Sequence, residues 1–143
     1  MFLRGLAGQN GEAGAPAGQS DTPSEVKDAE KSAVALAEGG DVDKAIEVLS
    51  SAVESFPQRG SLRNNRAQAY RLKGDTASAR ADLDFAIDME NAWLTANADA
   101  SGRSHWQAHK HVLQQAHTQR AILNQYVSAA PITRYALTHV IIQ

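Results

Sequence analysis

Apolar residues recur at steps of three and four along the chain, and this pattern predicts four amphipathic helices before residue 90. Pro57 should end the second helix, because proline cannot donate the next helical hydrogen bond. Gly74 should end the third in the left-handed conformation that glycine tolerates. The predicted helices cover residues 23–38, 42–56, 61–73 and 76–89.

The helix pattern repeats. The turns Gly40-Asp41 and Gly74-Asp75 lie 34 residues apart, and four further pairs of small or apolar residues keep the same spacing. A 34-residue helix-turn-helix period is typical of tetratricopeptide repeats, in which paired helices stack into a solenoid. Arg63 departs from that motif at a position that often holds an aromatic residue, and Asn91 departs where the first copy has proline. The four further pairs are Ala33 and Ala67, Ala45 and Ala79, Leu49 and Leu83, and Ala52 and Ala86.

The period breaks after Glu90, and a long polar helix is expected to begin near Ser104. Ala121 is the predicted small residue of a third copy, whose second helix we expect to be missing. The sequence therefore predicts an all-α tetratricopeptide-repeat solenoid of two full repeats plus a partial third, after a disordered N-terminal leader. The segments are a leader at 1–21, repeat 1 at 22–57, repeat 2 at 58–91, an insertion loop at 92–103, the first helix of repeat 3 at 104–126, and a divergent tail at 127–143.

A more specific resemblance appears in the second repeat. The run RGSLRNNRAQAYRLKGDTASARADLDFAID is similar to the central repeat of the tetratricopeptide repeat protein 36 family, and AHTQRAILNQ resembles the start of that family's third repeat. The similarity covers residues 27–126. Both ends lack that family's pattern, as expected of a truncated or alternatively spliced member. The resemblance implies a non-catalytic adaptor that binds the Hsp70 chaperone and is linked to tyrosine metabolism.

The partner is expected in the concave groove formed by the first helix of each pair. Asn65 matches the asparagine with which chaperone-binding repeats hold a peptide's C-terminal carboxylate. The rest of that carboxylate clamp is missing, because Glu30 and Val34 replace its first pair of residues and Gln115 and Gln119 its last. The predicted groove residues are Lys27, Lys31, Asn64, Asn65, Gln68 and Arg71.

Composition and motifs exclude other classes of function. A net charge of -2 and a pI near 6.2 argue against nucleic acid binding. Cysteine is absent, and no apolar run could span a membrane, so we expect a soluble, cytoplasmic protein without a membrane partner. No catalytic motif or cofactor-binding motif is present, and neither a catalytic residue nor a cofactor is predicted.

Two alternatives to an adaptor stay open. The incomplete third repeat could be completed by oligomerisation, which would make the chain a structural subunit. His105 and His109, four residues apart with His111 and His117 nearby, have a spacing that could chelate a metal. No third ligand follows them, so a polar helix face is favoured and no metal site is predicted.

Overall fold

The chain folds into helices throughout its described part. The computed structural model describes the backbone of residues 22–140 and the side chains of residues 22–125; the predicted leader lies outside this range. The described elements confirm the all-α prediction. They are α2 (Ser24–Glu38), α3 (Val42–Ser55), α4 (Gly60–Lys73), α5 (Thr76–Ala96), the short 3-10 helix η1 (Ala98–Ala100) and α6 (Ser104–Val140).

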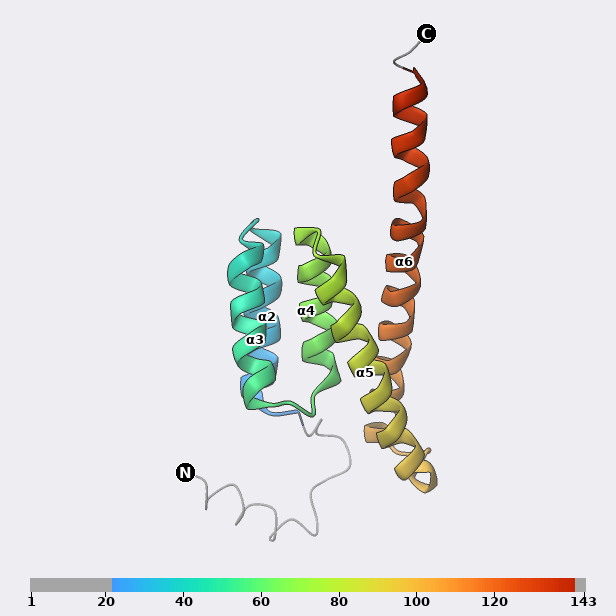
Figure 1. Cartoon of the computed structure of the whole chain (residues 1–143). Coiled ribbons are helices and arrows are strands. Elements are labelled where there is room, and N and C mark those ends of the chain that lie inside the picture. Colours follow the sequence, from blue (N-terminus) through green and yellow to red (C-terminus); the bar gives the residue numbers. More distant parts are fainter. Residues whose placement is uncertain (1–21, 141–143) are drawn as a thin grey trace.

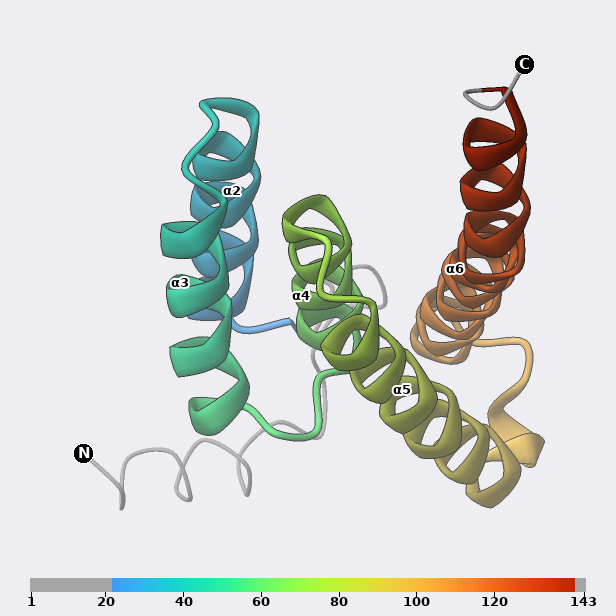
Figure 2. The same cartoon turned by 45° about the horizontal axis from the view of Figure 1, so that its top comes forward.

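The helices form two layers. Figures 1 and 2 show α2, α4 and α6 following one another in one layer, with α3 and α5 in the other. Each helix packs on the next in the chain, and α4 also touches both α2 and α6. This is the stacked helix-turn-helix arrangement of a tetratricopeptide-repeat solenoid.

The two repeats match at the level of single hydrogen bonds. Gly40 and Gly74 are the glycines with positive φ among the described residues, at 89° and 86°. The backbone N–H after each glycine reaches back five residues. Asp41 N donates to Leu36 O at 2.8 Å, and Asp75 N donates to Tyr70 O at 2.9 Å. The predicted 34-residue period is therefore present in the geometry of both turns.

The repeated small residues are where the helices cross. Every member of the four pairs predicted from the period is buried. The alanines of these pairs let helix backbones approach closely, while Leu49, Leu83 and other larger apolar side chains fill the space between the crossings. The first pair of helices and the second each surround a cluster, centred on Leu49 and on Leu83 respectively, and Ala116 and Leu123 of α6 extend the second one.

Helix α5 is seven residues longer than the sequence predicted. In the first repeat the helix stops before Pro57, but Asn91 stands at the equivalent position of the second repeat, and α5 continues to Ala96. Asparagine keeps the backbone donor that proline lacks, so nothing forces the helix to end there. The added turns carry Trp93 toward the start of α6.

Helix α6 begins at Ser104, as predicted, and continues unbroken to Val140. No turn within it separates a second helix of a third pair, and Figure 1 shows its C-terminal part extending past the other helices. The predicted crossing residue was wrong: Ala121 is exposed, whereas Ala116 is buried against the second cluster.

An ion-pair network joins α4 to both helices of the other layer, α3 and α5. Arg66 of α4 donates to both carboxylate oxygens of Asp82 at 2.7 Å, and to Ser50 of α3 at 3.1 Å. Arg63 reaches Asp82 at 3.3 Å and lies over the ring of Phe85. Asp82 is only 4% exposed, so it is a buried structural acid.

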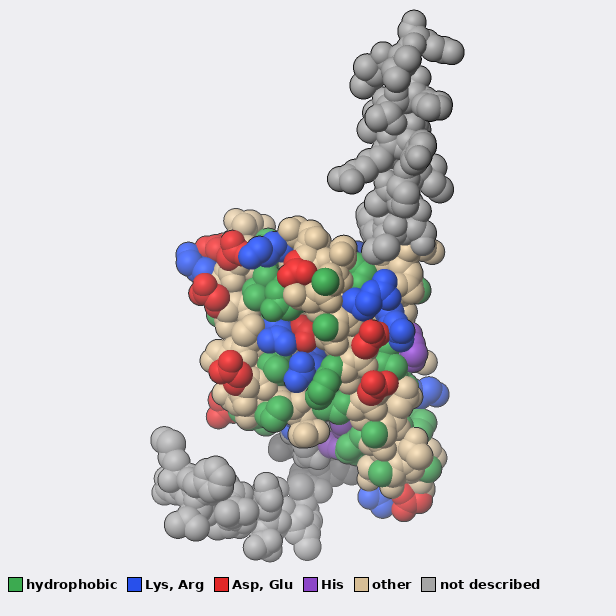
Figure 3. All heavy atoms as spheres, in the orientation of Figure 1, with side chains coloured by type: hydrophobic (Ala, Val, Ile, Leu, Met, Phe, Trp, Pro, Cys, Tyr) green, Lys and Arg blue, Asp and Glu red, His purple; other side chains and the backbone are tan. Residues whose placement is uncertain are grey.

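The bond to Asp82 raises the pKa of Arg66, which keeps the arginine charged. Figure 3 shows this face of the molecule, with positive, negative and hydrophobic side chains intermingled. No large area of one charge is visible on it.

Candidate partner-binding groove

A groove of about 390 Å³ lies between α2 and α4. Three alanines, Ala33, Ala37 and Ala69, keep its walls low, and Leu49 lies beneath them. The groove exists because these small side chains leave space that larger ones would fill.

The rim of this groove is both apolar and polar. Val34 is 50% exposed and Leu72 is 63% exposed, so two large apolar side chains of this groove face solvent. The amides of Asn65 and Gln68 also line it, and Glu38 is its one charged lining residue. Amides can hydrogen-bond a peptide backbone while the apolar residues receive a side chain.

The other predicted groove residues do not join this site. Lys27 lines a separate cavity, together with Glu30 and Ser61. Lys31 is exposed on α2 and lines neither cavity. Arg71 is half-buried on α4, and its Nε atom is buried without a hydrogen-bond partner among the described residues. Of the six predicted positions, only Asn65 and Gln68 come together.

The placement of Asn64 in the groove was wrong. Its side chain is 1% exposed, and its Nδ2 donates to the backbone carbonyl of Val112 in α6 at 3.0 Å. Adjacent residues on a helix point about 100° apart, so Asn65 faces α2 while Asn64 faces α6. Asn64 is therefore a structural link between α4 and α6.

Replacing Asn64 with alanine is expected to lower the free energy of unfolding by about 1–2 kcal/mol, because the Val112 carbonyl would lose its side-chain donor and a cavity would remain. Asn65→Ala is the matched control and should leave stability within about 0.5 kcal/mol of the wild type. Urea denaturation followed by circular dichroism measures both. Equal losses in the two variants would contradict this assignment.

The residues at the clamp positions do not converge on one point. Val34 lies on the groove rim and Glu30 in the separate cavity. Gln115 and Gln119 line a shallow hollow on α6, where Gln115 bonds His111 at 3.1 Å. Neither the carboxylate of Glu30 nor the apolar side chain of Val34 can donate a hydrogen bond to a peptide's carboxylate.

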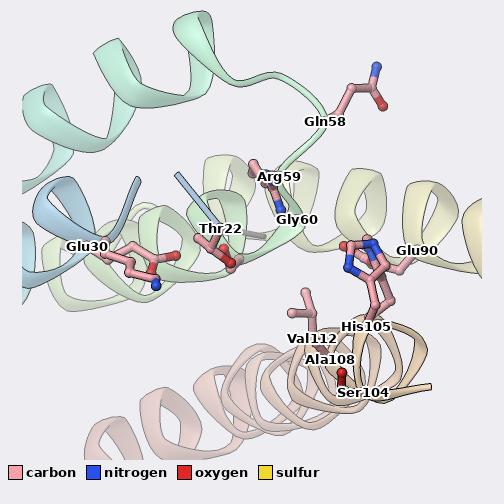
Figure 4. A pocket seen from close by; sticks show the side chains of 13 residues that line it. Thr22, Glu30, Gln58, Arg59, Gly60, Glu90, Ser104, His105, Ala108 and Val112 are labelled. Carbon is pink, nitrogen blue, oxygen red and sulfur yellow. The ribbon is translucent and has the colours of Figure 1, made fainter. Parts of the chain in front are cut away.

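The cavity lined by Lys27 is the second candidate binding site of the molecule. It has a volume of about 370 Å³ and lies among the beginnings of α2, α4 and α6. Figure 4 shows Glu30 on one side and Glu90 with His105 on the other, with Arg59 between them. Hydroxyl groups of Thr22, Ser61 and Ser104 add polar atoms to its lining.

A buried acid lies in the wall of this cavity. Glu90 is 2% exposed, and its Oε2 lies 2.6 Å from Nδ1 of His109. The backbone N–H of Gly60 donates to the same carboxylate, so Glu90 of α5 contacts both α4 and α6. A Cβ atom at position 60 would overlap Glu90 Oε1, which explains a glycine at the first residue of α4.

Aromatic rings lie beside the pair of Glu90 and His109. The His109 ring stacks on Trp93 with 3.7 Å between centroids and 14° between planes, and His105 lies tilted against both rings. Burial raises the pKa of Glu90 above its ordinary value of 4.5, although the bond from His109 opposes that shift. The cluster links three helices, because its polar groups come from α4, α5 and α6 and contact one another.

The sequence pattern singled out the histidines but not Glu90. The role of Glu90 follows only from the continuation of α5 past Asn91, which places Trp93 and Glu90 opposite His109. Within the part of the chain that the structure describes, no three potential metal-ligating side chains gather in one place. Over the same residues, no helix has the length and apolar character needed to cross a membrane.

Comparisons with known proteins bear on the repeats. No protein-family model matches the chain. Curated relatives do match: tetratricopeptide repeat protein 36 of Danio rerio is 46% identical over 67 residues, which is 47% of this chain and 36% of that protein. The Homo sapiens protein of the same name is 46% identical over 56 residues, 39% of this chain and 30% of the relative.

The Nematostella vectensis homolog matches further, at 39% identity over 80 residues, or 56% of this chain and 44% of the homolog. The matches span about a third of the first relatives' own length. Their names confirm the tetratricopeptide-repeat type, which the glycine turns and the helix crossings also indicate. The matched part of the chain is therefore related to the tetratricopeptide repeat protein 36 family.

Proposed function

We propose that the chain is a non-catalytic adaptor that binds a segment of a protein partner in the groove between α2 and α4. The observation that carries the proposal is the exposure of Val34 and Leu72 beside the amides of Asn65 and Gln68. Two large apolar side chains left in water favour a partner that covers them. The relatives, named as tetratricopeptide repeat proteins, support a role in protein interaction.

The groove favours an apolar anchor over a terminal carboxylate. Its lining holds alanines, leucines and amides, and its one charged residue, Glu38, would repel a carboxylate. We expect the partner to insert a leucine-sized side chain between Val34 and Leu72, and to bond its backbone to Asn65 and Gln68. Burying such a side chain contributes about 1.5–3 kcal/mol to affinity before ordering costs.

An Hsp70-type chaperone is the first partner to test, and a link to tyrosine metabolism is the pathway to test. Both come from the resemblance to the tetratricopeptide repeat protein 36 family. The chemistry of the groove adds a constraint: contact through an apolar segment of the chaperone fits it better than capture of the chaperone's C-terminal carboxylate.

The test is isothermal titration of the full chain with purified full-length Hsp70. Combining Asn65→Ala with Gln68→Ala is expected to weaken binding about tenfold or more, since two hydrogen bonds to the partner would be lost. The matched control combines Gln115→Ala with Gln119→Ala on α6, outside the groove. Equal affinity of the two double variants would remove the groove as the binding site.

A second candidate is a structural subunit completed by oligomerisation. It is favoured by α6, which lacks a pairing helix among the described residues and extends past the other helices (Figure 1). Size-exclusion chromatography with light scattering distinguishes the candidates, because a monomer at micromolar concentration is incompatible with obligate assembly.

A further inference from the structure

The groove between α2 and α4 has a candidate occupant within the chain itself. Residues 1–21 lie outside the described structure, and their large apolar residues all fall within the first six: Met1, Phe2, Leu3 and Leu6. A groove with exposed Val34 and Leu72 calls for apolar side chains of that size.

Charge supports the same pairing. Arg4 is the only charged side chain within Met1–Leu6, and Glu38 is the only charged side chain that lines the groove among the residues whose side chains the structure describes. A basic residue between apolar ones would place its charge beside that carboxylate. Pairing across a partly covered interface contributes modestly to affinity but fixes the register of the segment.

The length of the connection also fits. The groove residues of α2 run from Ala33 to Glu38, about 14–21 Å along the helix from its first residue, Ser24. Seventeen residues, 7–23, separate Leu6 from the start of that helix, and eight of them are glycine or alanine. A random coil of seventeen residues has a root-mean-square span of about 21–25 Å and a maximum reach of about 55–60 Å.

Effective concentration is highest when the span of a linker matches the distance to the site, and it reaches the millimolar range for short linkers. Even a weakly binding segment would then compete with a partner. We propose that Met1–Leu6 binds in the groove between α2 and α4 as an intramolecular competitor of the partner segment. This inference rests on the proposed function, because both place the ligand in the same groove.

The test uses the full chain. Because the sequence contains no cysteine, Gln9→Cys gives a single attachment site for a nitroxide spin label. The label is expected to reduce the NMR intensity of the Asn65 and Gln68 side-chain amides, and to leave those of Gln115 and Asn124 on α6 unchanged. Adding Phe2→Ser, Leu3→Ser and Leu6→Ser to the labelled chain should abolish the effect and raise the affinity for Hsp70 about two- to tenfold.

Each contrary result has a distinct meaning. Intensity loss that survives the triple substitution, or no loss at all, would overturn intramolecular docking. Loss seen only when labelled chains are mixed with separate isotope-enriched chains would assign the segment to a second copy, and would overturn it as well. If docking is observed but Hsp70 does not bind even the triple variant, the partner proposal fails while the intramolecular contact stands.

Discussion

Replacing Asp82 with alanine is expected to lower the free energy of unfolding by about 3–5 kcal/mol, the usual cost of removing one partner from a buried ion pair. Arg66 makes two bonds of 2.7 Å to Asp82 and a third to Ser50, so its guanidinium bridges α3, α4 and α5. Without Asp82 the part-buried positive charges of Arg66 and Arg63 would lose their counterion. Such a loss is a large share of the stability of a small domain.

Asp88→Ala is the matched control for this variant. Asp88 lies on the same helix but is exposed, so its removal should change stability by no more than about 0.5 kcal/mol. Urea denaturation of both variants at neutral pH gives the comparison. A loss below about 1 kcal/mol for Asp82→Ala would mean that the network contributes no more than a surface ion pair.

Replacing Glu90 with alanine is expected to cost about 3 kcal/mol, because His109 and the Gly60 N–H would both lose their acceptor inside the protein. Glu90→Gln is the informative companion. Its amide oxygen can accept from Gly60, and its amide nitrogen can donate to His109, so we expect a stability within about 1 kcal/mol of the wild type. Urea denaturation measures both, and equal losses would contradict the bonding scheme.

The same pair of proteins gives a pH test. Burial raises the pKa of Glu90 in the folded chain above its ordinary value of 4.5. Below that value the side chain is protonated in both folded and unfolded states and adds no pH dependence. As the pH rises, the Glu90 side chain of the unfolded state loses its proton before that of the folded state does. The free energy of unfolding therefore falls until the pH has passed the folded pKa.

Glu90→Gln cannot titrate and should not show this decline. The stability of the wild type relative to Glu90→Gln is therefore expected to fall as the pH rises from 4.5 toward neutral. Denaturation at several pH values across that window measures the difference. A constant difference would contradict the raised pKa.

The repeat fold could be predicted because its determinants are local and periodic. Gly40 and Gly74 end helices through their own backbone conformation, and the alanines at the crossings report close approach by their size alone. Such signals need no knowledge of the neighbouring helix. The extension of α5 was not predicted for a related reason. Asn91 replaces the proline that would end the helix, but it does not determine at which later residue the helix ends.

The site was less predictable, because it depends on the direction in which a side chain points. Asn64 and Asn65 are identical neighbours, yet one is buried against α6 and the other lines the groove. Their directions on the helix, about 100° apart, decide that difference, and the helix that each direction meets depends on the packing of α6, which buries Ala116 and leaves Ala121 exposed. The role of Glu90 could not be predicted for the same reason, since its partner His109 lies 19 residues away, beyond the insertion.

The proposed binding of a partner segment between α2 and α4 can be observed residue by residue. The most direct measurement is an NMR titration of the isotope-labelled full chain with purified Hsp70, following side-chain amides. We expect the Asn65 and Gln68 resonances to shift or broaden first, while those of Gln115 and Asn124 on α6 stay unchanged. Perturbation of the α6 amides without any change at Asn65 and Gln68 would contradict it.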